Sequence, residues 1–174
     1  MKTKKYLLVG ALILSLSTPA IAQNDSYKAA LNPIISAIEA APNDVNAGKD
    51  LIKDYLKTYK KDEQALTALG NVYLAQRNFA EAMKIANSIV SNKKMNGTLG
   101  YLLLGDIVAL QDSVGNAGAA AQNYATAISL DPHNVAAYER YAKVYRHVNP
   151  QVSVQKLEEL RQVEPNYPVE ATAA

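Results

Sequence analysis

The chain has 174 residues, of which 18 are basic and 16 are acidic, and 49% are hydrophobic. It contains no cysteine, which excludes disulfide bonds and thiol catalysis, so packing alone must hold the fold together. The small net charge and the lack of a Lys/Arg-rich run provide no electrostatic footprint for nucleic acid, and we expect no nucleic-acid partner.

A secretory signal peptide is predicted over residues 1–22. Three lysines open it: Lys2, Lys4 and Lys5. An apolar run from Tyr6 to Leu16 follows, and small residues at Ala20 and Ala22 mark a cleavage site after Ala22. The alternative is a membrane anchor, but a span needs about 20 apolar residues. We therefore expect a periplasmic protein with no stable membrane insertion after cleavage. It is not expected to be a lipoprotein, because the chain has no cysteine to carry the lipid.

The expected mature chain begins at Gln23 and carries 15 basic and 16 acidic side chains. Its 152 residues are enough for one domain with a core and too few for two independent domains. Residues 23–26 are polar and are expected to form a short disordered lead.

Residues 27–61 are predicted to form an atypical N-terminal helix pair. The first helix runs from Tyr27 to Ala40, and Asn32-Pro33 either starts it or kinks it. The second helix is expected from Val45 to Tyr59, capped by Asn43-Asp44. Its apolar face is formed by five residues: Leu51, Ile52, Tyr55, Leu56 and Tyr59.

Three further helix pairs are predicted, over residues 62–96, 97–133 and 134–166. Asparagine or aspartate precedes most of their helices, as is typical of N-caps: Asp62, Asn78, Asn134 and Asn149. Equivalent residues are 35 positions apart from Leu66 to Tyr101 and 37 apart from Tyr101 to Tyr138. The pair over 97–133 is the longest, with about three extra residues in its loop between Leu110 and Gly118. A unit near 34 residues with a helix-turn-helix in each indicates a repeat array.

These residues resemble the tetratricopeptide repeat family. The unit over 62–96 matches the family pattern at Leu66, Leu69-Gly70, Tyr73, Phe79 and Ala82. The next unit matches it at Tyr101, Leu104-Gly105, Ala120, Tyr124, Ala127 and Asp131-Pro132. The last unit departs from it, with Tyr141-Ala142 for Leu-Gly and Ser153 for the packing alanine. The resemblance implies an all-α fold, a right-handed alpha-alpha superhelix or solenoid of about four helix-turn-helix repeats.

Catalytic and cofactor motifs are missing from the sequence. The two histidines are His133, in a turn, and His147, near a predicted helix end, and a lone turn histidine is usually a solvated side chain. Asp112 to Asn116 carries oxygen ligands but lacks the alternation and closing glutamate of a calcium loop. We expect no enzyme activity, no metal and no cofactor.

Two stripes of side chains are candidates for binding. Tyr138, Tyr141 and Tyr145 share one helix face and indicate either an aromatic platform or core packing against the partner helix. The second stripe consists of Asn71, Asp106 and Lys143, each of which follows a small packing residue, so stacked units would align them in a row.

The resemblance implies that this row lies in a concave groove lined by the first helix of each unit. Four residues would flank it: Gln64, Thr67, Glu139 and Arg146. The alternative is ordinary solvated surface, in which Glu139 and Lys143 form an ion pair four residues apart. Asn71 and Arg140 match part of the carboxylate clamp found in some members of the family. However, Thr67, Asp106 and Ala136 replace its other donors, and Asp106 would repel a carboxylate, so we do not expect that role.

The expected function is therefore a non-catalytic protein-protein interaction scaffold that binds a peptide or a partner protein in this groove. The alternatives are a structural subunit of a cell-envelope assembly and an accessory domain of a larger enzyme. Residues 167–174 are expected to open a further helix, cut short by the end of the sequence. The helix before it carries Val154, Leu157, Leu160 and Val163, so we also expect either continuation of the array or self-association through this end.

Overall fold

The computed structural model describes residues 26–42, 44, 46–112 and 115–168, and all the regular structure in this part of the chain is helical. The helices are α1 (Ser26–Ala40), α2 (Lys49–Tyr59), α3 (Glu63–Ala75), α4 (Phe79–Val90), α5 (Thr98–Gln111), α6 (Ala117–Leu130), α7 (Val135–Tyr145) and α8 (Pro150–Val163). The predicted all-α class is confirmed. The predicted signal peptide and residues 23–25 lie outside the described residues.

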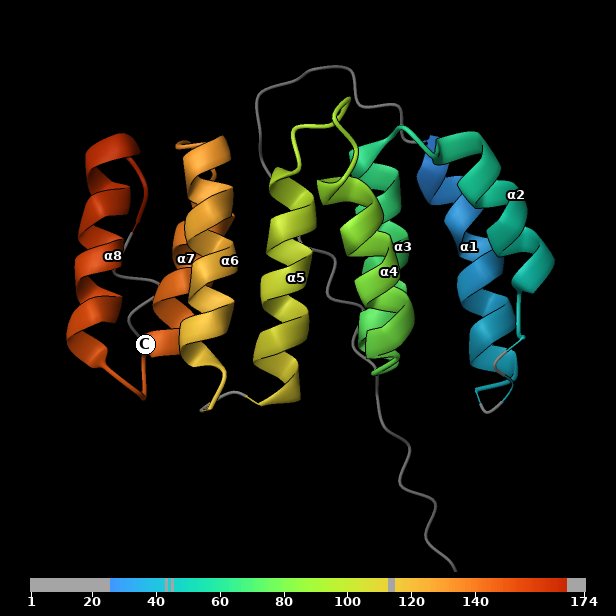
Figure 1. Ribbon diagram of the computed structural model, residues 1–174, viewed down its shortest axis with the longest axis horizontal. Coiled ribbons are helices and arrows are strands. Elements are labelled where there is room, and N and C mark those ends of the chain that lie inside the picture. The colour runs from blue at the N-terminus through green and yellow to red at the C-terminus, as the bar shows by residue number, and fades with distance from the viewer. Residues whose placement is uncertain (1–25, 43, 45, 113–114, 169–174) are drawn as a thin grey trace, which may run out of the picture.

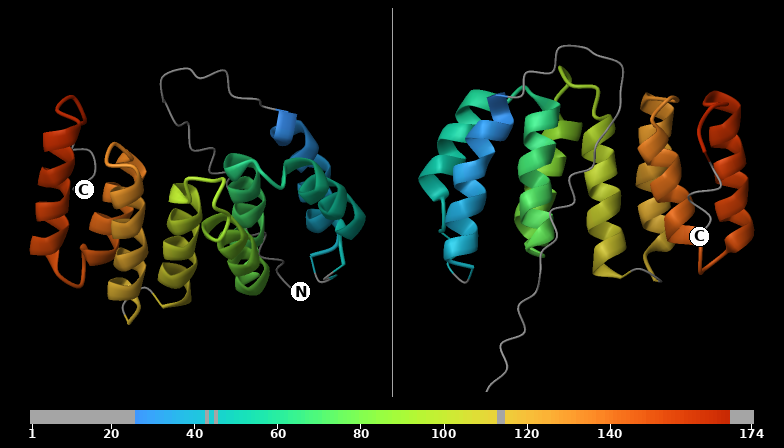
Figure 2. Two further views of the ribbon diagram at one scale, coloured as in Figure 1. Left: turned by 45° about the horizontal axis from the view of Figure 1, so that its top comes forward. Right: turned by 180° about the vertical axis from the view of Figure 1, so that it is seen from behind.

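The helices stand side by side along the long axis of the molecule, with α8 at the opposite end from α1 and α2 (Figure 1). Consecutive helices pack on each other, and α3 also packs on α5. Helices α3 and α7 lie behind α4 and α6 in Figure 1, and the reverse view of Figure 2 brings them to the front. Among the described residues, no helix combines the length and the hydrophobicity needed to cross a membrane.

Side-chain caps fix the starts of four helices where the sequence predicts them. Asp62 Oδ1 accepts a hydrogen bond from the Ala65 amide at 3.0 Å, and Asn78, Asn134 and Asn149 cap α4, α7 and α8 in the same way. Helix α5 begins differently, after Gly97, whose φ of +87° lies in the left-handed region that favours glycine. The predicted starts of α3, α4, α7 and α8 are therefore confirmed.

The N-terminal pair differs from its prediction in three places. Helix α1 does not start at Asn32-Pro33 but runs through Pro33 from Ser26. Pro33 is exposed, so the carbonyl that it leaves without a helical donor can meet water. Helix α2 starts at Lys49 instead of Val45, after Gly48 in a left-handed conformation. Leu51, predicted on the apolar face, is 43% exposed, whereas Tyr55 on the same helix is buried.

The apolar interior forms two clusters that meet at α5. The larger one joins α1 to α5 and includes Leu69, Ile89, Leu103 and Ile107. The smaller one is built from Leu102, Ala120, Tyr124, Ala127 and Ala137 and joins α5 to α7. Helix α5 therefore contributes to both clusters, with Leu103 and Ile107 in the larger one and Leu102 in the smaller one.

The connection inside the third pair is longer than that in the second. Residues 112–116 join α5 to α6, whereas residues 76–78 join α3 to α4, in line with the predicted extra residues. Asp112 Oδ1 accepts a hydrogen bond from the Gly115 amide at 2.9 Å. Residues 113–114 lie outside the described residues.

The outer surface of α8 is less apolar than its sequence suggests. Leu157 and Leu160 are buried, and only Val154, at 55% exposure, is an exposed large apolar residue on this helix. Exposed polar residues such as Gln155 and Glu158 surround Val154. This surface gives little support to the expected self-association through α8. Tyr167 and Pro168 are not helical, and residues 169–174 lie outside the described residues.

Candidate partner-binding surface

The predicted row of Asn71, Asp106 and Lys143 lies on α3, α5 and α7. Each residue is nine positions after the residue that precedes its helix, namely Asp62, Gly97 or Asn134. Asn71 and Lys143 are exposed, as predicted. Asp106 is not: its side chain is only 22% exposed. The three residues therefore share a register but not an environment.

Asp106 is the centre of a polar cluster drawn from three helices. Its Oδ1 accepts a hydrogen bond from the Tyr124 hydroxyl of α6 at 2.9 Å, and its Oδ2 lies 2.9 Å from Arg140 Nη1 of α7. Burial raises the pKa of the Asp106 carboxyl, and Arg140, the Tyr124 hydrogen bond and Lys143 act in the opposite direction. Both carboxylate oxygens therefore have partners inside the molecule.

Gly105 allows this cluster to form. The Tyr124 ring lies directly against the Gly105 backbone, so that a β-carbon at this position would be 2.3 Å from Tyr124 Cε1. The structure shows that Gly105 accommodates an aromatic ring. Tyr124 is 2% exposed, and its burial and the nearby Asp106 carboxylate both raise its pKa.

Two flanking residues also make internal contacts. Glu139 accepts a hydrogen bond from the hydroxyl of Tyr167, in the segment after α8, rather than pairing with Lys143. Burial and this hydrogen bond raise the pKa of Tyr167 to about 12. The Thr67 hydroxyl donates to the Glu63 carbonyl at 2.7 Å. Of the other two flanking residues, Gln64 is exposed and Arg146 is half-buried at the end of α7.

The tyrosine stripe of α7 belongs mainly to the packing. Tyr138 is 5% exposed and its hydroxyl donates to the Pro132 carbonyl at 3.2 Å. Tyr141 and Tyr145 are half-buried, with ring centroids 5.4 Å apart, and Lys156 of α8 lies over the Tyr141 ring at 4.6 Å. These contacts favour the packing interpretation over an open aromatic platform.

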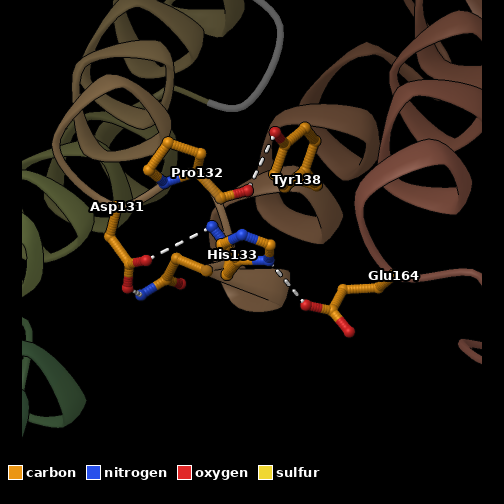
Figure 3. Close-up of polar contacts among 6 residues, drawn as sticks. Asp131, Pro132, His133, Tyr138 and Glu164 are labelled. Carbon is orange, nitrogen blue, oxygen red and sulfur yellow. Dashed lines mark hydrogen bonds and ion pairs between the residues drawn. The ribbon is translucent and has the colours of Figure 1, made fainter.

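His133 lies in the turn before α7, as predicted, and contacts the end of α8. Figure 3 shows its Nδ1 beside Glu164 Oε1, 3.0 Å away, while its backbone amide donates to Asp131 Oδ1 at 3.2 Å. The side chain is 70% exposed. No group of three His, Cys, Asp or Glu side chains in the described ranges is arranged to hold a metal ion. Through its contact with Glu164, His133 joins the α6–α7 turn to the end of α8.

Sequence reasoning missed Glu63, which joins two helix pairs. Its carboxylate accepts hydrogen bonds from the Gly97 amide at 3.1 Å and the Leu99 amide at 2.7 Å. These amides belong to the start of α5, where an anionic side chain is favourable. Glu63 thus supplies from α3 the cap that Gly97 cannot provide. The available sequence signal was that residue 97 has no side chain to cap α5, so that the cap had to come from elsewhere in the chain.

Two comparisons with known proteins complete this description. No protein-family model matches the chain, and a search of curated proteins gave no significant match.

Proposed function

We propose that this chain is a right-handed solenoid of about four tetratricopeptide-like helix pairs that serves as a non-catalytic interaction scaffold. Its partner would be a peptide or another protein, bound along α3, α5 and α7. The observation that carries this proposal is the common register of Asn71, Asp106 and Lys143 on these three helices. We propose the periplasm as its location, after removal of residues 1–22.

The chemistry of the surface suits an extended segment. Gln64 and Asn71 are exposed amides that can both donate to and accept from a peptide backbone, and Lys143 adds an exposed positive charge. Asp106 already has internal partners for both carboxylate oxygens. Direct contact with a partner is therefore assigned to Gln64, Asn71 and Lys143, and Asp106 is assigned to holding the surface together.

A structural subunit of a large assembly is supported less well. Such a role calls for a continuous apolar surface. The exposed large hydrophobic residues of the described chain are scattered over different segments: Leu51, Leu110, Leu130, Val148 and Val154. A polar surface that forms reversible contacts fits this distribution better.

Site-specific photo-crosslinking in the periplasm would test the scaffold. A photoreactive residue at position 71 or 143 should give the same partner adduct, whereas one at Asn87, exposed on α4, should not. Asn71→Ala/Lys143→Ala should weaken capture while changing stability by less than about 0.5 kcal/mol, since both residues are exposed. Equal capture by the wild type and the double variant would refute the assignment of this surface.

The proposed location has its own test. Intact-mass measurement of the protein from the native envelope should give a chain that begins at Gln23. A chain that retains Met1 would contradict the proposed export.

A further inference from the structure

Helix α5 has a helix neighbour in the row on each side, and the two contacts differ in chemistry. We call the α3–α5 contact the first seam and the α5–α7 contact the second seam. Leu103 is six residues after Gly97, and Arg140 is six residues after Asn134. The same register position therefore carries leucine at the first seam and arginine at the second.

The first seam is apolar and tight. Leu103 is 1% exposed and packs against Gly70 of α3, so closely that a β-carbon on Gly70 would lie 2.3 Å from Leu103 Cδ2. Leu103 also belongs to the large apolar cluster that joins α1 to α5. Separating α3 from α5 would expose this apolar surface to water.

The second seam combines a polar contact with the smaller apolar cluster, whose buried members include Leu102 of α5 and Ala137 of α7. Arg140 reaches across it to Asp106, which also binds the Tyr124 hydroxyl, and we call these three residues the latch. Gly105 has the register position of Gly70, and the three atoms nearest to a β-carbon there all belong to the Tyr124 ring of α6. Helix α7 packs chiefly on α6 and α8. The Asp106 and Arg140 side chains are 22% and 27% exposed, so water reaches both.

We propose that the second seam is a hinge at which α7 and α8 move together away from α5, and that the latch holds it closed. Opening would exchange this ion pair, and the contacts that the smaller apolar cluster makes between α5 and α7, for water. The α6–α7 and α7–α8 packing would stay in place. The separation of Asp106 and Lys143 on the candidate surface would then be adjustable, whereas that of Asn71 and Asp106 would be fixed. The hinge can be tested without a partner, so its failure would be distinguishable from failure of the proposed function.

Distance measurements between spin labels would test the hinge, and the absence of native cysteine makes labelling selective. One pair, Asn87→Cys on α4 and Gln155→Cys on α8, reports on the second seam. A control pair, Lys53→Cys on α2 and Gln122→Cys on α6, reports on the first seam. All four positions are exposed. Each pair is measured in the otherwise unchanged chain and in variants of the latch.

Arg140→Gln should broaden the distance distribution of the α4–α8 pair and leave that of the α2–α6 pair unchanged. Lys84→Gln, which removes the exposed Lys84–Glu81 ion pair within α4, is the matched control and should change neither. The double variant Asp106→Asn/Arg140→Leu gives the second seam the leucine that the first seam has at this register position. It should give an α4–α8 distance distribution narrower than that of the wild type.

An unchanged α4–α8 distribution in Arg140→Gln, or equal broadening of both pairs, would overturn the hinge. Circular dichroism establishes whether each variant is folded. If Arg140→Gln does not fold, the double variant decides. A distribution narrower than that of the wild type then supports the hinge, and a width equal to that of the wild type overturns it.

Discussion

Replacing Gly105 by alanine is the sharpest stability test of the packing at the candidate surface. Glycine in the middle of a helix is unfavourable relative to alanine by about 1 kcal/mol, so propensity alone predicts stabilisation. In this structure the new methyl group would lie 2.3 Å from Tyr124 Cε1 and 2.7 Å from Tyr124 Cδ1. The ring cannot move easily, because it is 2% exposed and its hydroxyl is hydrogen-bonded to Asp106.

Overpacking of a core costs about 1–3 kcal/mol, and displacing the Tyr124 hydroxyl from a carboxylate costs roughly a further 1 kcal/mol or more. After subtraction of the propensity gain, Gly105→Ala should lower the free energy of unfolding by about 1–3 kcal/mol. Gly118→Ala on α6 is the matched control, since its nearest neighbour, the Tyr145 hydroxyl, is 3.9 Å from the new methyl group. It should be neutral or stabilising by up to about 1 kcal/mol.

Gly70→Ala tests a similarly short contact with a neighbouring side chain that is easier to move than the Tyr124 ring. Its methyl group would also lie 2.3 Å from a side chain, but the atom is the terminal Leu103 Cδ2, which a change of rotamer can move. The loss should therefore be smaller than that of Gly105→Ala. The shortest distance is the same at both sites, but the next atom is 2.7 Å away at Gly105 and 3.3 Å away at Gly70, so the crowding at Gly105 is also more extensive.

Urea denaturation followed by circular dichroism would measure these differences. In a Tyr124→Leu background the ring is gone, and Gly105→Ala should then cost less than it does in the wild type, which a double-mutant cycle detects. The reasoning fails if Gly105→Ala is as stable as the wild type, or if its cost is the same with and without the Tyr124 ring.

Three further predictions concern single residues. Glu63→Ala should lower the free energy of unfolding by about 1–2 kcal/mol, because it leaves the Gly97 and Leu99 amides without the carboxylate. Glu63→Gln keeps an acceptor oxygen and should lower it less, and equal losses of the two variants in urea denaturation would contradict this. Burial raises the pKa of Asp106 above its ordinary value of 3.8, so the native carboxyl holds its proton where the unfolded one has lost it. The stability of the wild type relative to Asp106→Asn should therefore fall as the pH rises above 3.8, and a difference that is constant or grows with pH would contradict the assigned burial. Arg77 has a φ of +56°, so Arg77→Gly should raise the free energy of unfolding by about 0.5–1 kcal/mol, and a lower melting temperature would show that the arginine side chain compensates for its backbone.

The starts of α3, α4, α7 and α8 could be predicted because each signal is local. A capping side chain binds an amide three residues ahead of it, as Asp62 binds the Ala65 amide, so the sequence alone contains both partners. The start of α2 could not be predicted in the same way. Asp44, the predicted cap, accepts a hydrogen bond from the Asn46 amide and forms a turn, and Gly48 in a left-handed conformation then begins the helix. Two turn-forming residues compete there, and tertiary packing decides between them.

The register of the candidate surface was predictable, but the environment of its central residue was not. The spacing of the units is enough to place Asn71, Asp106 and Lys143 at equivalent positions. Burial of Asp106 depends on Tyr124, 18 residues away, and on Arg140, which lies on another helix pair. Arg140 and Leu103 occupy equivalent positions in the repeat register. The change from leucine to arginine was the sequence signal that a polar contact replaces an apolar one at the second seam.

This difference decides how mutations of the surface must be interpreted. If all three side chains lay open in the groove that the resemblance implies, replacing Asn71, Asp106 and Lys143 together by alanine would remove partner contacts at little cost in stability. In the structure Asp106 pairs with Arg140, and its removal leaves a half-buried guanidinium without its carboxylate. A loss of partner capture in the triple variant would therefore mix a binding effect with a structural one. Capture that is lost in Asp106→Ala but retained in Asn71→Ala/Lys143→Ala would mean that the partner depends on the α5–α7 geometry and not on the exposed side chains.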